Sequence, residues 1–134
     1  MKADKKAIVN KPIVVGTLPQ VIIDKYELEC DSNDVKMYPG AIKHIQRKHP
    51  GIYERYSGKI KDIIENPDYV GNNPKEPNSV ELIKVIDEHI LIAIKLDPSG
   101  YLFLSSMYDM NNGPVKVEKR LKSGRLQPYL DLIG

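Results

Sequence analysis

The chain has 134 residues, of which 41% are hydrophobic and 28% are charged, a balance typical of one soluble globular domain and not of a disordered chain. Cys30 is the only cysteine, which excludes a disulfide framework and a zinc site built from several thiolates. No apolar run is long enough to span a membrane, so we expect no membrane partner.

The basic residues gather in two segments, although the formal net charge is only +2. One segment covers residues 43–61 and the other residues 116–125, and each contains a single glutamate among its lysines and arginines. Two such segments predict a face that binds an anionic ligand. The alternative is a pair of helix faces that are merely solvated.

The N-terminal part is predicted to contain a lead, a helix and a strand. Residues 1–11 are polar and rich in lysine, which predicts a flexible lead or linker before a single domain over residues 12–134. Pro19, followed by an apolar run, predicts a helix over residues 19–26. Residues 35–38 are typical of a short strand.

Apolar residues at helical spacing predict two further helices. The first is AIKHIQRKH, residues 41–49, and Pro50 ends it because the residue before a proline is driven out of the α region. The second covers residues 57–65, with Ile60, Ile63 and Ile64 on one face and Ser57 as its N-cap.

Three strands are predicted in the second half of the chain, over residues 80–86, 90–96 and 101–108. The segment DPSG, residues 97–100, is a turn between the last two, so we expect an antiparallel meander with one face packed on the helices. Residues 114–122 favour a basic helix over a strand, and Gly124 fits the position just after its end.

The helix over residues 41–49 carries the first candidate site residues, His44 and His49. On a helical wheel His49 points toward the middle of the apolar face, whereas His44 and Lys48 lie together at its edge. The spacing of five disfavours a shared metal, for which a spacing of four is usual. A structural role for His49, with a bond to a carbonyl, remains the alternative.

Two more candidates are the serines of LSSMY, residues 104–108, and the cations near the C-terminus. Regular alternation places Ser106 on one face of the strand and Ser105 on the other, and a serine here could hold a phosphate oxygen or only satisfy local hydrogen bonds. No G-x-S-x-G motif surrounds either serine, so neither is expected to be a nucleophile. The cations of KVEKRLKSGRL, residues 116–126, are suited to a phosphate clamp or to a solvated surface.

Several segments, in this order, carry a resemblance to a known family: VVGTLPQVI, AIKHIQRKHP, IKDIIENPDYVG, ELIKV, LIAIKL, GYLFLSSMY and KVEKRLKSGRL. Over residues 13–126 the chain resembles the phage-associated branch of the barnase–EndoU–colicin–RelE (BECR) nuclease superfamily, which includes toxin-type domains. The resemblance implies an α+β fold with N-terminal helices packed on a four- to five-stranded antiparallel sheet. It also implies a metal-independent endoribonuclease that needs no cofactor.

The resemblance also implies roles for individual residues. His44 and His49 occupy the helix histidine positions, Ser106 stands where threonine is more frequent, and Arg120 and Lys122 match the basic segment. These five are the expected catalytic residues, with His44 as base, His49 as acid, Ser106 orienting a phosphate oxygen and the two cations stabilising charge. The expected substrate-binding residues are Lys48, Ser105, Tyr108, Lys119 and Arg125.

The expected reaction is attack of the RNA 2′-hydroxyl on the adjacent phosphorus, which yields a 2′,3′-cyclic phosphate. Expected partners are RNA, with tRNA among the candidate targets, an acidic immunity or antitoxin protein, and a larger phage or mobile-element parent protein, in the cytoplasm of a bacterial or phage-infected cell. Two alternatives remain open: a module that binds RNA without cutting it, and a protein-interaction domain of a phage particle.

Overall fold

The three long strands predicted from the sequence are present and form the centre of the sheet. In this computed structural model, which describes residues 11–134, they are β4 (Ser79–Val85), β5 (His89–Leu96) and β6 (Leu102–Asp109). Successive strands pair antiparallel, which confirms the predicted meander. The lead predicted over residues 1–11 falls, apart from Lys11, outside the described residues.

Four short strands extend this centre on both sides. Strands β1 (Ile13–Thr17) and β2 (Asp34–Met37) lie beyond β6, and β3 (Tyr69–Gly71) and β7 (Leu126–Pro128) lie beyond β4. The sheet of the described residues therefore has seven strands, in the order β1-β2-β6-β5-β4-β3-β7.

The expectation of a four- to five-stranded antiparallel sheet was wrong in two respects, although the α+β class is correct. The sheet is wider, and β2 runs parallel to β6. Strands of three to five residues are too short for a period-two pattern to stand out, and a parallel pair joins segments that are distant in the chain.

Most helices begin and end close to the predicted residues. Helix α2 covers Gln20–Lys25, α3 covers Pro39–Lys48, and α6 covers Gly113–Ser123 and ends at Gly124, whose φ of 82° is the left-handed conformation expected there. None of the helices in residues 11–134 is long and apolar enough to cross a bilayer.

The helix predicted over residues 57–65 is divided into shorter pieces. Helix α4 (Ile52–Tyr56) begins earlier, Ser57 opens the 3-10 turn η1 (Ser57–Lys59), and α5 covers Ile60–Glu65. Ser57 therefore is not the N-cap, because the chain is already helical before it. A short helix α7 (Tyr129–Ile133), which the sequence did not suggest, follows β7.

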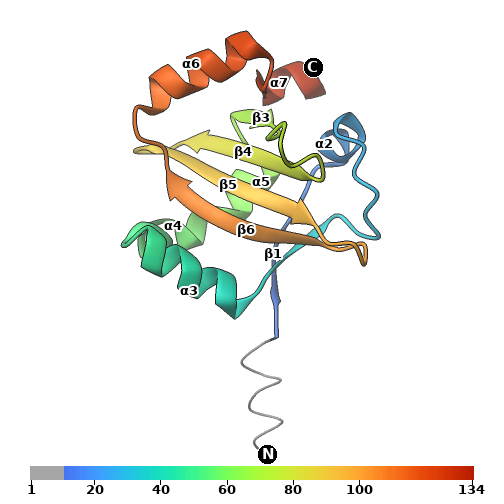
Figure 1. Cartoon of the computed structure of the whole chain (residues 1–134), viewed down its shortest axis with the longest axis vertical. Coiled ribbons are helices and arrows are strands. Elements are labelled where there is room, and N and C mark those ends of the chain that lie inside the picture. The colour runs from blue at the N-terminus through green and yellow to red at the C-terminus, as the bar shows by residue number, and fades with distance from the viewer. Residues whose placement is uncertain (1–10) are drawn as a thin grey trace, which may run out of the picture.

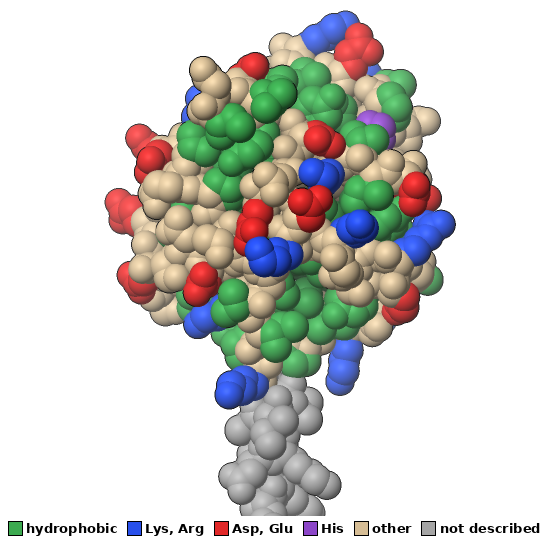
Figure 2. Space-filling model, turned by 180° about the vertical axis from the view of Figure 1, so that it is seen from behind, with side chains coloured by type: hydrophobic (Ala, Val, Ile, Leu, Met, Phe, Trp, Pro, Cys, Tyr) green, Lys and Arg blue, Asp and Glu red, His purple; other side chains and the backbone are tan. Residues whose placement is uncertain are grey.

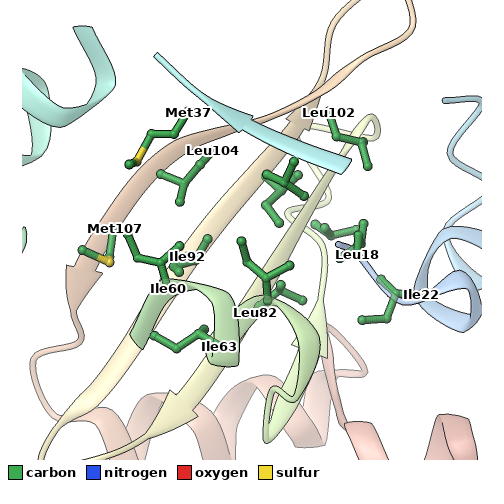
Figure 3. Packing of buried hydrophobic residues seen from close by; sticks show 14 of the residues in the cluster. Leu18, Ile22, Met37, Ile60, Ile63, Leu82, Ile92, Leu102, Leu104 and Met107 are labelled. Carbon is green, nitrogen blue, oxygen red and sulfur yellow. The ribbon is translucent and has the colours of Figure 1, made fainter. Parts of the chain in front are cut away.

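One face of the sheet is covered by helices and holds the main hydrophobic core. The three isoleucines of α5 pack here, and Figure 3 shows this helix against buried side chains of β4, β5 and β6. The members labelled in that view are Leu18, Ile22, Met37, Ile60, Ile63, Leu82, Ile92, Leu102, Leu104 and Met107. Ile45 attaches α3 to the same core.

A β-bulge in β6 changes which side chains share a face. Ala93 pairs with Ser106, whereas the next residue, Ile94, pairs with Leu104, so Ser105 is an extra residue in β6. The regular alternation predicted for this strand was therefore wrong beyond Leu104. Met107 joins Leu104 in the main core, and Ser106 turns to the opposite face together with Tyr108.

The opposite face of the sheet is covered only in part, by α6. Val117 of this helix forms a second, smaller core with buried side chains of the sheet and the loops beside it, which are Ile83, Leu91, Met110 and Leu126. In Figure 1 the broad middle of β4, β5 and β6 lies between α6 above and α3 below. This face carries the polar and aromatic side chains described next.

Candidate functional site

A buried carboxylate and two arginines meet on the face that α6 covers in part. Glu81 of β4 is only 6% exposed. Its Oε1 accepts two hydrogen bonds from Arg125, from Nε at 3.1 Å and from Nη2 at 2.8 Å. Nη1 of Arg120, on α6, lies 3.9 Å from the same oxygen. The charge of a buried glutamate is therefore balanced by guanidinium groups from the C-terminal part of the chain.

The guanidinium of Arg120 keeps one donor nitrogen unused. Its Nη1 is buried and has no hydrogen-bond partner among the described residues. Buried donors are almost always satisfied by a protein group, a water or an ion, so this nitrogen is available to a further partner. A phosphate oxygen is a matching acceptor for an arginine N–H.

Tyr108 of β6 links this charged cluster to the end of helix α3. The ring of His49 stacks on the Tyr108 ring, with centroids 5.2 Å apart and 26° between their planes. Burial, and then the charge of Glu81, raise the pKa of the Tyr108 phenol, while Arg120 and Arg125 oppose that shift. At neutral pH the phenol is protonated and available as a donor.

His49 reaches Tyr108 because helix α3 ends at that residue. His49 is the C-cap of α3, its backbone has left the helical conformation (φ −134°, ψ 70°), and Pro50 prevents the helix from continuing. The side chain is half-buried. The sequence predicted that His49 lies within the apolar face of the helix. In the structure it lies at the helix end, against the sheet.

Ser106 lies on the same face, across the sheet from Glu81. Ala93 of β5 pairs with both residues, with Glu81 on one side and Ser106 on the other. At about 4.8 Å between neighbouring strands, the backbones of Glu81 and Ser106 are about 10 Å apart. Because Ala93, which lies between them, has only a methyl side chain, little of the space above this part of the sheet is filled.

Ser105, the extra residue of the bulge, has its hydroxyl engaged within the sheet. The hydroxyl donates to the carbonyl oxygen of Ala93 at 3.2 Å. This is the local hydrogen bond that the sequence left open as an alternative to a ligand contact.

The structure places the remaining predicted site residues on the helices α6 and α3. Lys122 pairs with Glu118 at 3.0 Å on the exposed side of α6, and Lys119 is also exposed. His44 is half-buried on α3 and Lys48 is exposed. His44 lies inside α3, whereas His49 is at its non-helical end.

Sequence reasoning missed Glu81, which is central to the cluster. It stands in the segment SVELIKV, where apolar residues surround it on a strand that is buried along most of its length. A single glutamate within a strongly apolar strand was the available signal, because such a charge is rarely buried without a partner.

In a comparison with protein-family models, residues 12–117 match the family described as phage-Barnase-EndoU-ColicinE5/D-RelE like nuclease 3. The matched range includes Glu81, His49, Ser106 and Tyr108 and ends before Arg120. Searches of curated proteins and of solved structures found no match. The match confirms the resemblance seen in the sequence, and the chain belongs to this family of phage-type BECR nucleases.

Proposed function

We propose that this protein is a metal-independent endoribonuclease whose active site is the cluster of Glu81, Arg120, Arg125, Tyr108 and His49. One observation carries the proposal: in a chain of a nuclease family, two arginine guanidinium groups converge on a buried carboxylate, on a sheet face that α6 covers only in part. These groups supply what cleavage of a phosphodiester requires, which is a base, an acid and a positive charge.

The proposed reaction begins with attack of the RNA 2′-hydroxyl on the adjacent phosphorus. Both Arg125 hydrogen bonds go to Oε1 of Glu81, so its Oε2 is the oxygen that accepts the 2′ proton. His49 donates a proton to the departing 5′-oxygen, and Tyr108 positions the imidazole by stacking on it. The P–O5′ bond breaks as the P–O2′ bond forms, which leaves a 2′,3′-cyclic phosphate and a 5′-hydroxyl.

Arg120 has the role of charge stabiliser in this proposal. The phosphorane-like transition state concentrates negative charge on its non-bridging oxygens, and an N–H already fixed beside the phosphate stabilises that charge without reorganisation. Ser106, about 10 Å across the sheet from Glu81, orients a phosphate oxygen on the other side of Ala93. His44, the base expected from the sequence, is the alternative to Glu81.

The biological setting is part of the same proposal and rests on the resemblance of the sequence to toxin-type domains. The enzyme acts on RNA, possible targets including tRNA, in the cytoplasm of a bacterial or phage-infected cell. It is carried by, or released from, a larger phage or mobile-element protein. An acidic immunity protein covers the arginines, because a negatively charged partner complements a basic site.

The test is cleavage of total bacterial RNA and of a defined oligoribonucleotide, in the presence of EDTA. We expect cleavage by the wild type, with mass spectrometry showing the 2′,3′-cyclic phosphate. The His49→Ala and Arg120→Ala variants should lose about 100-fold or more in rate. An oligonucleotide with 2′-O-methyl groups should not be cut, because its 2′-oxygen carries no proton.

Two comparisons assign the base and control for fold. Glu81→Gln and His44→Ala are measured side by side, and the variant that loses the rate identifies the base. Lys61→Gln removes a charge at an exposed position of α5, the helix packed on the opposite face of the sheet, and should cleave as the wild type does. A folded wild type that binds RNA without cutting it would favour the binding module, and cleavage abolished by EDTA would refute the metal-independent mechanism.

A further inference from the structure

A second feature lies on the same sheet face, at the other end of β6. Tyr101, just before this strand, and Phe103 within it are neighbours, with ring centroids 6.0 Å apart. Tyr38 extends the row, at 6.1 Å from Tyr101. All three rings are half-buried. Phe103 is the only phenylalanine of the chain, and it stands on the open face and not in the main core.

Two lysines flank these rings. The Nζ of Lys36 lies over the Tyr101 ring, 4.9 Å from its centroid, and Lys36 pairs with Phe103 across the β2–β6 junction. Lys95 pairs with Phe103 from the other side, on β5. Cations held beside accessible aromatic faces are the combination with which proteins bind single-stranded nucleic acids.

Phe103 and Lys95 also line a hollow of about 250 Å³. Asp97 and Glu76 also line it. The Nζ of Lys95 lies 3.3 Å from Oε1 of Glu76, and hydrogen bonds from Ser99 hold the pKa of the Asp97 carboxyl below its usual value. Ionised carboxylates repel phosphate but accept hydrogen bonds from the amino groups of bases. The hollow is therefore suited to a base and not to the nucleic-acid backbone.

The aromatic row and the proposed active site share one strand. On β6 the order is Phe103, Ser106 and Tyr108, all on the same face because of the bulge at Ser105. Phe103 is roughly 7–10 Å from Ser106 along the strand. Figure 2, the view from behind, shows the helix-covered side, on which basic and acidic side chains are intermingled.

We propose that Tyr101 and Phe103, with Lys36 and Lys95 beside them, form a stacking platform for the bases of single-stranded RNA that leads into the cleavage site. The inference rests on the proposed function for its choice of RNA as substrate. It adds the class of RNA, because bases can stack on a protein only where they are not paired in a duplex.

The experiment measures binding of probes that cannot be cleaved. A fluorescein-labelled 2′-O-methyl oligonucleotide, as a single strand and as a duplex, is titrated with the protein, and 2-aminopurine within the single strand reports stacking. We expect Phe103→Leu to weaken single-strand binding about tenfold and to abolish the 2-aminopurine quenching. Phe103→Tyr should restore both, and the duplex should not respond.

Controls distinguish a loss of RNA binding at the platform from a loss of folding and from a loss of catalysis. Thermal unfolding shows that Phe103→Leu is folded, and Lys61→Gln is the matched control for the weaker binding expected of Lys36→Gln. With an oligoribonucleotide, Phe103→Leu should raise KM and leave kcat nearly unchanged.

The outcomes distinguish this inference from the proposed function. Equal single-strand affinity and equal quenching in wild type and Phe103→Leu would overturn the platform, even for an active nuclease. So would a wild type that does not bind the single strand. Phe103-dependent binding without cleavage would support the platform and overturn the nuclease proposal.

Discussion

Arg125 donates two hydrogen bonds to one oxygen of Glu81, at 3.1 and 2.8 Å, across 44 positions of the chain. The pair joins the turn after α6 to the buried strand β4. It fixes the C-terminal part of the chain to the sheet at the place where Arg120 and Tyr108 also converge. Stability and site geometry therefore depend on the same contact.

The first prediction concerns the stability carried by this pair. Arg125→Ala leaves the Glu81 carboxylate buried with one weaker partner, so the free energy of unfolding should fall by about 3 kcal/mol. Glu81→Leu combined with Arg125→Leu should cost less than the sum of the two single variants, because the double variant removes the carboxylate and its main guanidinium partner together. Urea unfolding of the four proteins measures the coupling, and simple additivity would contradict it.

The second prediction tests the bulge at Ser105. Ser105→Ala removes one hydroxyl bond to Ala93 and should cost only about 1 kcal/mol. Deletion of Ser105 removes only the extra residue and should leave Met107 in the core and Tyr108 on the opposite face, because Ser106, Met107 and Tyr108 keep their partners in β5, so the variant should still fold. Circular dichroism and thermal unfolding compare the two variants. A deletion variant that does not fold would contradict the assignment of Ser105 as the extra residue of β6.

The third prediction compares two glycines, one closely packed and the other with open space around it. A Cβ on Gly71, in β3, would overlap the carbonyl oxygen of Arg125 and lie 2.7 Å from a side-chain carbon of Leu126. Gly71→Ala should therefore destabilise the protein by about 1–3 kcal/mol and, by displacing Arg125, lower the rate of RNA cleavage.

Gly40→Ala is the matched control for that variant. Gly40 lies in α3, and a Cβ there meets nothing within 4 Å. The change should stabilise the protein by about 0.5 kcal/mol, because alanine has less freedom to lose on folding. Equal melting temperatures for the Gly71 and Gly40 variants would contradict the close approach of β3 to Arg125.

The fourth prediction concerns the phenol of Tyr101. Hydrogen bonding with Tyr38, followed by burial, raises the pKa of Tyr101 to about 12 from 10.0. The pKa of Tyr101 is higher in the folded state than in the unfolded state. The stability that the protonated phenol gives the folded state is therefore complete below pH 10 and is lost as the pH rises toward 12. The difference between the absorbance titrations of wild type and Tyr101→Phe isolates this group. Its midpoint should fall when Tyr38 is changed to Phe, and an unchanged midpoint would contradict the Tyr38 contact.

The sequence predicted the elements that local patterns encode. The meander of β4, β5 and β6 was visible because strands of seven or eight residues with a proline–glycine turn differ clearly from their surroundings. Helix α3 was visible because its apolar spacing ends at Pro50. The short strands β1, β3 and β7 escaped detection, because their pairing is made by backbone groups that any sequence provides.

The sequence by itself determined the α+β class, the nuclease family and the segments in which basic and histidine residues stand. Periodicity, caps and motif order are properties of neighbouring residues, and they survive without knowledge of the fold. Only the tertiary structure decided which of these residues meet. The bulge at Ser105 turns Ser106 and Tyr108 to the open face, the end of α3 carries His49 to Tyr108, and the buried charge of Glu81 selects Arg125 and Arg120 from the C-terminal cations. Those contacts join residues far apart in the chain, and their energies depend on burial, which no local pattern expresses.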